Sequence, residues 1–178
     1  MMRVAITGGI AEGKSTVLTY LAEAGYSTAS ADAAARAVFE TEPVQAFLTE
    51  SIGSTEHAVV RERLASDDTF RRELNRLTHP AIVAALTSSP AQFIEVPLLI
   101  EAVLQSQFTA VWVVTCGQVE QTRRLVSRLR NPDLAAEMLR TQLPTEVKIP
   151  FADAVVRTNC SEESVRDYVI EAAREISQ

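Results

Sequence analysis

A glycine-rich string near the start of the chain, G-G-I-A-E-G-K-S-T at positions 8–16, constrains the fold more than any other feature. It contains the pattern G-x-x-x-x-G-K-[S/T], directly after an apolar segment at 3–7 and directly before a helical pattern through Val17, Leu18 and Leu21. A strand, a glycine turn and a helix in this order form a phosphate-binding loop, in which backbone N–H groups and the positive end of the helix dipole converge on phosphate oxygens. The sequence therefore predicts an α/β fold that binds a nucleotide.

Two side chains of this loop have predicted chemical roles. Lys14 is expected to reach the β and γ phosphates of a triphosphate, and the Ser15 hydroxyl to ligate Mg²⁺. Glu12 is unusual because a carboxylate repels phosphate, and we expect its side chain to turn toward solvent. The alternative is a glycine turn with an incidental lysine, although Lys14 and Lys148 are the only lysines in the chain. The residues predicted to bind the nucleotide are Gly8, Gly9, Ala11, Glu12, Gly13, Lys14, Ser15 and Thr16.

Composition narrows the class of protein. The 178 residues are 47% hydrophobic and 22% charged, which is typical of a globular domain large enough to fold without disulfides or a metal. A net charge of −6 provides no global positive field, so neither nucleic acid nor an anionic membrane is an expected partner. Cys116 and Cys160 lack metal-ligand spacing, and we expect two unpaired thiols. Neither a signal peptide nor an apolar run of about 20 residues is present in the sequence, so we expect a cytoplasmic protein.

Short apolar and β-branched segments alternate with helical patterns along the chain, as in a parallel sheet between helices. One helix is predicted to begin after Gly117 and the closing helix after a Ser161 cap, while Trp112 is expected in the core. The helix after Gly117 has an expected apolar side that consists of Val119, Thr122, Val126 and Leu129. The segments predicted to form a five-stranded parallel sheet are residues 3–7, 26–29, 91–96, 110–115 and 154–158.

The predicted organisation is a single domain over residues 1–178 with an insert and a lid. Residues 33–88 have the pattern of several helices without a strand, one of them capped by Asp67, and this stretch is too long for a simple crossover. We expect it to cover one edge of the sheet and to contribute a substrate pocket. Residues 128–145 form the expected lid. An arginine fork there suits the charge of a transferring phosphoryl group, whereas the alternative for Arg128 is a solvated helix face.

The class of phosphate-loop protein is narrowed by which motifs occur. The strings N-K-x-D and D-x-x-G, which GTPases use for guanine and the γ phosphate, are absent from the sequence. A small chain with a helical insert and a lid suits a kinase of small metabolites, because the lid excludes water and so prevents hydrolysis of ATP.

Several further strings, in order, resemble the dephospho-coenzyme A kinase family over nearly the whole chain. The phosphate loop is similar to that family's G-G-I-G-S-G-K-S-T. The family's D-A-D-x-x-A-R is matched by S-A-D-A-A-A-R at 30–36, its H-P pair by His79-Pro80, and its D-V-P-L-L-F-E by E-V-P-L-L-I-E at 95–101. Toward the carboxyl end the matching residues are Gln142, Leu143, Pro144, Lys148, Ala152, Asp153 and Asn159.

The resemblance implies a three-layer P-loop kinase fold and transfer of the γ-phosphoryl group of ATP, with Mg²⁺, to the ribose 3′-hydroxyl of dephospho-CoA. It assigns catalytic roles to Lys14, Asp32 and Arg128, the last in preference to Arg130. Asp32 also follows the second predicted strand, at the sheet edge where ligands bind, although a helix cap explains it equally well. The residues that it assigns to the acceptor are Asp32, Arg36, His79, Pro80, Leu98 and Glu101. Structural roles remain alternatives for His79 and Glu101.

The chain departs from the family pattern at several positions, which leaves two other functions open. One is a kinase of another metabolite or nucleotide, and the other is a catalytically weak nucleotide-binding regulator. The replaced residues are Ala11 and Glu12 in the loop, Ser30, Glu95, Arg157 and Cys160, together with a shortened lid turn at 128–133. Because alanine tolerates a positive φ poorly, we expect the path of the loop to differ slightly.

Overall fold

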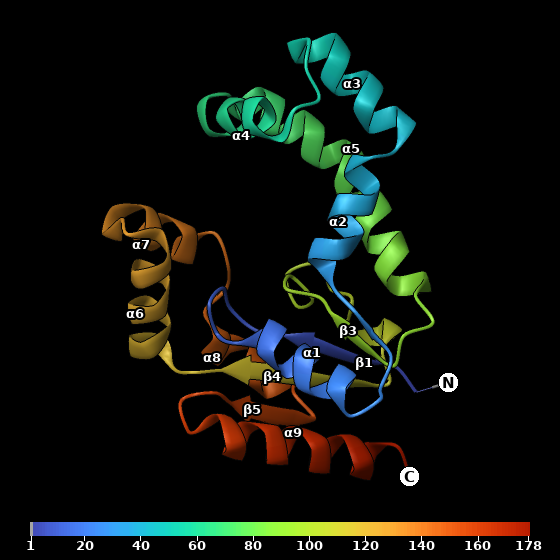
Figure 1. Cartoon of the computed structure of the whole chain (residues 1–178), viewed down its shortest axis with the longest axis vertical. Coiled ribbons are helices and arrows are strands. Elements are labelled where there is room, and N and C mark those ends of the chain that lie inside the picture. Colours follow the sequence, from blue (N-terminus) through green and yellow to red (C-terminus); the bar gives the residue numbers. More distant parts are fainter. Residues whose placement is uncertain (1) are drawn as a thin grey trace. The chain divides into compact units, whose positions relative to one another are not determined.

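The computed structural model describes residues 2–178, with the side chain of residue 65 left aside. These residues form two compact units. The first comprises the chain up to Ser30 and from Pro90 onward, and the second is Ala31–Ser89. The first unit contains a sheet, whereas the regular elements that the structure describes in the second unit are all helices (Figure 1).

The sheet of the first unit is parallel throughout and has the strand order β2-β3-β1-β4-β5. Every residue of the interior strands β3, β1 and β4 is buried. The predicted α/β class with a five-stranded parallel sheet is confirmed, and each strand lies within its predicted segment. The strands are β1 (Val4–Thr7), β2 (Thr28–Ala29), β3 (Phe93–Glu95), β4 (Ala110–Thr115) and β5 (Ala154–Arg157). Because all are parallel, their carboxyl ends meet at one edge, where open α/β sheets bind ligands.

Helices α1 (Lys14–Glu23) and α9 (Glu162–Ile176) pack against each other and against alternate residues of β1 and β4. Trp112 is 1% exposed, and its ring centroid lies 5.2 Å from that of Phe93, so the prediction of a core residue is confirmed. The fully buried apolar side chains of this cluster include Val4, Ile6, Val17, Leu21, Phe93, Val114, Val156 and Val169. This packing fixes the start of α1 at the end of β1, which sets the position of the loop between them.

The carboxyl-terminal helices confirm one prediction and correct another. The Ser161 hydroxyl accepts a hydrogen bond from the Ser164 backbone N–H at 3.2 Å, so the cap of α9 is confirmed. Helix α6 (Gln118–Leu129) begins after Gly117 as predicted, but its predicted apolar side is wrong. Gln121 and Leu125 are its buried residues, whereas Val119 is 87% exposed. The reason is that the Gln121 amide bonds to the phosphate loop, which draws a polar position inward.

Helix α6 is followed by α7 (Pro132–Arg140), which packs against it. Arg130 ends α6 in the left-handed conformation, with φ 52°, and the Asn131 side chain accepts a hydrogen bond from the Leu134 N–H at the start of α7. A short helix, α8 (Thr145–Lys148), and the turn Ile149–Phe151 lead into β5. None of the helices that the structure describes combines the length and apolar composition of a membrane span.

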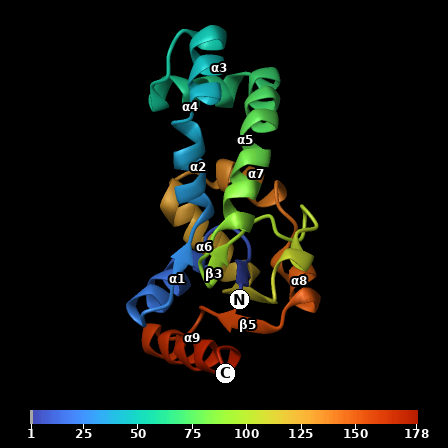
Figure 2. The same cartoon turned by 90° about the vertical axis from the view of Figure 1, so that its right-hand side faces the viewer.

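The second unit is a helical cluster in which α2 and α5 lie side by side (Figure 2). Asp67 caps α5 by accepting hydrogen bonds from the N–H groups of Thr69 and Phe70, as predicted. Pro80 lies inside α5. The helices are α2 (Ala31–Phe39), α3 (Glu42–Ile52), α4 (His57–Ser66) and α5 (Asp68–Ser88). Their buried apolar side chains are Val38, Val44, Leu48, Val60, Phe70 and Leu74.

Candidate active site

The phosphate loop runs from the end of β1 to the first turn of α1. Lys14 is the first residue of the helix, and its Nζ donates a hydrogen bond to the Gly9 carbonyl at 2.8 Å. The N-cap is Gly13, in the left-handed conformation with no side chain to cap the helix, and the first turn contains no acidic residue. Ser15 and Thr16 are exposed there. The start of α1 therefore suits an anion, with two hydroxyls beside it.

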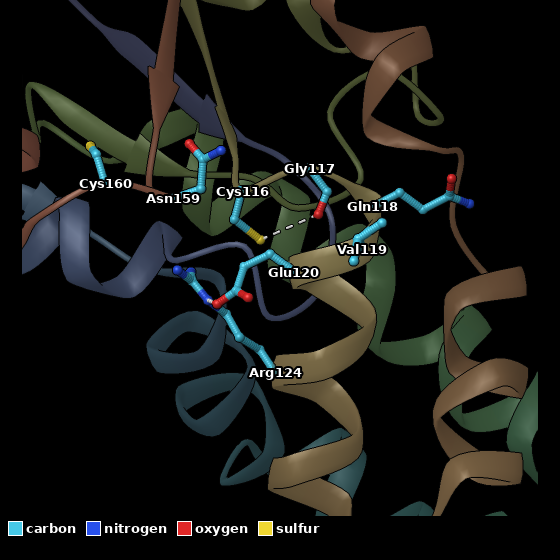
Figure 3. A pocket seen from close by; sticks show the side chains of 8 residues that line it. All are labelled: Cys116, Gly117, Gln118, Val119, Glu120, Arg124, Asn159 and Cys160. Atoms are coloured by element: carbon cyan, nitrogen blue, oxygen red, sulfur yellow. Dashed lines mark hydrogen bonds and ion pairs between the residues drawn. The ribbon is translucent and has the colours of Figure 1, made fainter.

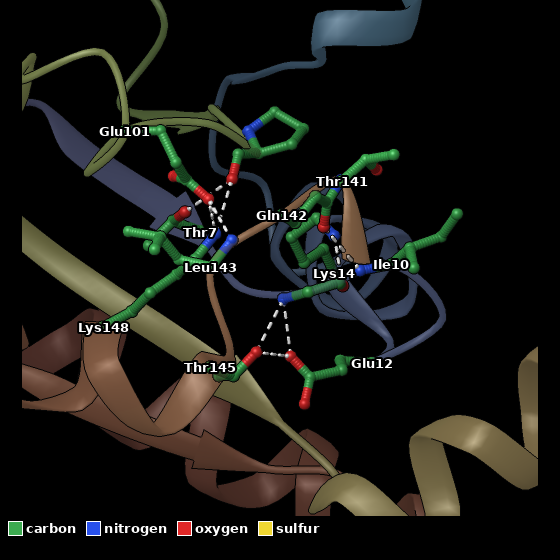
Figure 4. A network of polar contacts seen from close by, with 12 residues as sticks. Thr7, Ile10, Glu12, Lys14, Glu101, Thr141, Gln142, Leu143, Thr145 and Lys148 are labelled. Atoms are coloured by element: carbon green, nitrogen blue, oxygen red, sulfur yellow. Dashed lines mark hydrogen bonds and ion pairs between the residues drawn. The ribbon is translucent and has the colours of Figure 1, made fainter. Parts of the chain in front are cut away.

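Glu12 does not turn toward solvent, and the sequence-based prediction for it is wrong. Its side chain is buried, with the residue 1% exposed, and it points under the loop (Figure 4). One carboxylate oxygen accepts hydrogen bonds from the Gly9 N–H at 2.5 Å and from the Thr145 hydroxyl, and the other accepts from the Thr115 hydroxyl at 3.0 Å. Three donors, two of them on distant elements, satisfy the carboxylate and explain why it is tolerated there.

Two glutamines hold the backbone of Ile10, next to the loop's second glycine. The Ile10 N–H donates to Gln142 Oε1 at 3.1 Å, and Gln121 Nε2 donates to the Ile10 carbonyl at 3.0 Å. A Cβ atom on Gly9 would lie 2.2 Å from Gln121 Nε2, so any other residue here would displace the Gln121 side chain. Ala11 adopts φ 63°, the left-handed conformation that favours glycine. The loop thus keeps a left-handed turn despite the alanine.

The segment after β3 is held by a buried ion pair. Lys148 is fully buried, and its Nζ lies 2.8 Å from Glu101 Oε1 and donates to the Pro97 carbonyl at 3.1 Å (Figure 4). The Leu143 N–H also donates to Glu101 Oε1, at 3.1 Å. Glu101 Oε2 is buried without a hydrogen-bond partner among residues 2–178. Leu98 is 40% exposed. The Oε1 atom of Glu101, paired with Lys148 and Leu143, has a structural role.

A hollow of about 510 Å³ lies beyond the end of β4 (Figure 3). Its wall includes Arg124, whose Nε donates to Glu120 Oε1 at 2.7 Å and whose two terminal nitrogens donate to the Thr158 hydroxyl and carbonyl. Hydrogen bonds from Arg123 and Arg124 lower the pKa of Glu120 to about 2, so this carboxylate stays charged and fixes Arg124. The residues that line the hollow are Cys116, Gly117, Gln118, Val119, Glu120, Arg124, Asn159 and Cys160.

A second hollow adjoins this one. Arg124 and Cys160 also line the second hollow, of about 330 Å³, whose other walls include Gly13 and Thr16 of the loop region. The Thr158 hydroxyl donates to the Glu12 carbonyl at 2.7 Å, which ties the loop to the same wall. Sequence reasoning did not find these hollows. The signal that could have indicated them is Gly117, which separates β4 from α6 at the edge of the sheet that carries the phosphate loop.

The two cysteines are free thiols, as predicted: Cys116 is buried and Cys160 is exposed. Burial raises the pKa of the Cys116 thiol above its usual value, so that thiol is protonated at neutral pH. No cluster of three or more histidine, cysteine, aspartate or glutamate side chains among the described residues could hold a metal.

The remaining predicted site residues fall in both units. In the first unit, Arg128 is exposed in the last turn of α6. In the second unit, Asp32 and Arg36 are exposed on α2, and the Arg36 Nε donates to the Asp32 carbonyl at 3.3 Å. His79 and Pro80 are exposed on α5, the helix that packs against α2. The four predicted acceptor residues of this unit are thus brought to one pair of helices.

Comparisons with known proteins agree with one another. A family model described as dephospho-CoA kinase matches residues 2–164. Dephospho-CoA kinase of Carboxydothermus hydrogenoformans is 34% identical over 186 residues, covering 94% of this chain and 90% of the relative. The enzyme of the same name from Shouchella clausii is 31% identical and covers 96% of both chains.

Solved structures share the fold. Dephospho-CoA kinase from Campylobacter jejuni matches with a TM-score of 0.70 at 20% identity, covering 98% of this chain and 96% of that chain. Shikimate kinase from Acinetobacter baumannii matches with a TM-score of 0.60 at 19% identity, covering 99% and 93%. At these identities the structural likeness is evidence for the fold alone.

Proposed function

Because the chain belongs to the dephospho-CoA kinase family, we propose that it transfers the γ-phosphoryl group of ATP to the ribose 3′-hydroxyl of dephospho-CoA, giving coenzyme A and ADP. This is the last step of coenzyme A biosynthesis. The observation that carries the proposal is that the hollow beside Arg124 shares two lining residues, Arg124 and Cys160, with a second hollow whose walls include Gly13 and Thr16 at the start of α1.

In the proposal, ATP occupies the hollow beside Arg124 and the phosphate loop. The base enters the hollow between the start of α6 and Asn159, where the guanidinium of Arg124, fixed by Glu120, provides a planar cationic wall. The phosphates reach the start of α1. There the Lys14 Nζ, which donates to the Gly9 carbonyl in this structure, contacts the β and γ phosphates.

Mg²⁺ fits the donor set at the start of α1. Magnesium prefers oxygen ligands and keeps several waters, so one protein hydroxyl together with phosphate oxygens suffices. Ser15 supplies an exposed hydroxyl in the first turn of α1, directly after Lys14. The ion, when bound, neutralises charge on the β and γ phosphates.

The chemical step needs in-line positioning and charge stabilisation rather than covalent catalysis. The 3′-oxygen of the acceptor attacks the γ phosphorus, the bond from that phosphorus to the bridging oxygen of ADP breaks, and Asp32 accepts the hydroxyl proton. Lys14 and Arg128 stabilise the charge on the transferring group. Arg128 is exposed and without an ion pair among the described residues, so its guanidinium is available for this role.

The acceptor contacts follow the family resemblance. They are assigned to Asp32, Arg36, His79 and Pro80 on α2 and α5, and to Leu98 and Glu101 after β3. For Glu101 the buried oxygen without a partner, Oε2, is the atom left to accept a hydroxyl, since Oε1 is paired with Lys148.

The test is ADP release from purified protein with ATP and Mg²⁺, measured with dephospho-CoA, with shikimate, with nucleosides and without an acceptor. We expect ADP release that depends on dephospho-CoA, together with a product heavier by one phosphoryl group. Release with a different acceptor would assign the chain to another kinase activity. Nucleotide binding without release for any acceptor would instead identify a non-catalytic regulator.

A further inference from the structure

We propose that Glu12 and Thr145 form a tie that holds the phosphate loop in its nucleotide-binding conformation. Both are positioning residues, since they act through the loop backbone and not on the nucleotide itself. The inference rests on the proposed function only in that the loop binds nucleotide phosphates; it does not depend on which acceptor is used.

The tie joins residues that are distant in sequence. Glu12 lies inside the loop, whereas Thr145 begins α8, at the end of the predicted lid. The Thr145 hydroxyl donates to the carboxylate of Glu12 and accepts from the Gly9 N–H at 3.0 Å, and that same N–H also donates to the carboxylate at 2.5 Å. All three groups are buried, with Glu12 1% and Thr145 2% exposed. Water therefore cannot replace a missing partner without a rearrangement of the loop.

The loop of this chain needs such a support because of the residue beside Glu12. Ala11 adopts φ 63°, a conformation unfavourable for a residue with a Cβ atom, so the free loop tends to leave it. Glu12 is the next residue, and its side chain is anchored to Thr145 and to Thr115 at the end of β4. Anchoring the side chain fixes the backbone on the carboxyl side of Ala11 and opposes this tendency.

The same geometry explains how a carboxylate is compatible with phosphate binding. The Glu12 side chain points under the loop, toward Thr115 and Thr145. Its charge is engaged by three donors, so it serves as an acceptor that shapes the loop. If the loop is competent in only a fraction of molecules, the apparent affinity for nucleotide falls by that fraction.

The experiment measures the Kd of ADP with Mg²⁺ by calorimetry for the wild type, Thr145→Val, Thr145→Ser and Glu12→Gln. Valine has the shape of threonine without the hydroxyl, and we expect Kd to rise about tenfold, as for a buried hydrogen bond whose partner is left unsatisfied. Serine keeps the hydroxyl, and we expect Kd within about twofold of the wild type. Glu12→Gln combined with Thr145→Val should weaken binding by less than the product of the two single effects, because both cut the same tie.

Lys148→Met is the matched control. Lys148 is as deeply buried as Thr145 and belongs to the same short helix, but its ion pair and hydrogen bond are with Glu101 and Pro97 and not with the loop. We expect it to lower the melting temperature and to leave the Kd of ADP within about twofold. In turnover assays, Thr145→Val should raise the KM for ATP more than it lowers kcat, whereas a general loss of structure would lower both the active fraction and the melting temperature.

Distinct results overturn the inference and the proposed function. An unchanged Kd of ADP in Thr145→Val, or an equal rise of Kd in Lys148→Met, would refute the inference about the tie. Neither result would contradict the proposed kinase function. Tighter binding of ADP by Glu12→Gln would show that the carboxylate repels the nucleotide. That result would also refute the inference about the tie. Wild-type protein that does not bind ADP would contradict both, whereas ADP binding with the expected pattern but no product from dephospho-CoA would contradict the function alone.

Discussion

At the scale of single residues, Lys14 is the side chain on which the proposed phosphoryl transfer depends most. Its Nζ is 2.8 Å from the Gly9 carbonyl, in the loop that we propose receives the phosphates. Lys14→Ala should reduce kcat/KM at least about a hundredfold, since a preorganised cationic donor at the transferring group is lost. The measurement is acceptor-dependent ADP release, with circular dichroism as the control for folding. A variant that retains full activity would rule out the phosphate-loop mechanism.

A substitution of Asp32 tests its proposed role as the base. Asp32 lies in the first turn of α2 and is exposed, so its carboxylate is free to turn toward a ligand. Asp32→Asn keeps the size of the side chain and removes the proton acceptor, and we expect kcat to fall about a hundredfold or more while the Kd of ADP is unchanged. Turnover close to the wild-type value would leave Asp32 with the structural role of a residue at a helix start.

Replacing Ala11 with glycine is expected to stabilise the fold. At φ 63° an L-residue with a Cβ atom carries about 1 kcal/mol of strain that glycine avoids. Ala11→Gly, the residue of the family pattern, should therefore stabilise the fold by about 0.5 kcal/mol after the added chain entropy is subtracted, which corresponds to roughly 1–2 °C in Tm. Thermal unfolding without nucleotide measures this, and a lower Tm for the glycine variant is the contrary result.

At the scale of elements, the turn between α6 and α7 also contains a non-glycine residue in the left-handed conformation. Arg130 ends α6 with φ 52° and donates its backbone N–H to the Val126 carbonyl at 2.8 Å. Glycine is the usual residue at such a helix end. Arg130→Gly should raise the free energy of unfolding by about 0.5–1 kcal/mol without changing the Kd of ADP. Denaturant titration of the variant beside wild type decides it, and destabilisation would indicate that the Arg130 side chain has contacts of its own.

Strands and helix caps follow from local signals, and the sequence predicted them well. The β-branched run at β4 and the Asp67 and Ser161 caps need only neighbouring residues, because periodicity and capping are local effects. The buried side of α6 was predicted wrongly for the opposite reason. A hydrophobicity pattern cannot place Gln121 inside, since its partner is the Ile10 carbonyl, distant in sequence.

At the scale of the whole molecule, the ordered motifs predicted the family and the class of fold, which the comparisons confirm. The orientation of Glu12 was not predictable in this way. Two of its donors, Thr115 and Thr145, are contributed by β4 and α8, and only the folded chain brings them under the loop. The hollow lined by Arg124 and Asn159 likewise forms between the start of α6 and the loop after β5, which are distant in sequence. Tertiary contacts therefore decide the details of this site.

The most direct measurement of the central claim follows the transferred group itself. The protein is incubated with dephospho-CoA and ATP whose γ-phosphoryl oxygens carry a heavy isotope, and the product is analysed by mass spectrometry and phosphorus NMR. We expect the labelled phosphoryl group on the ribose 3′-oxygen of the product, with none formed by Lys14→Ala. A labelled phosphate released to water, or a label at another position, would contradict the account.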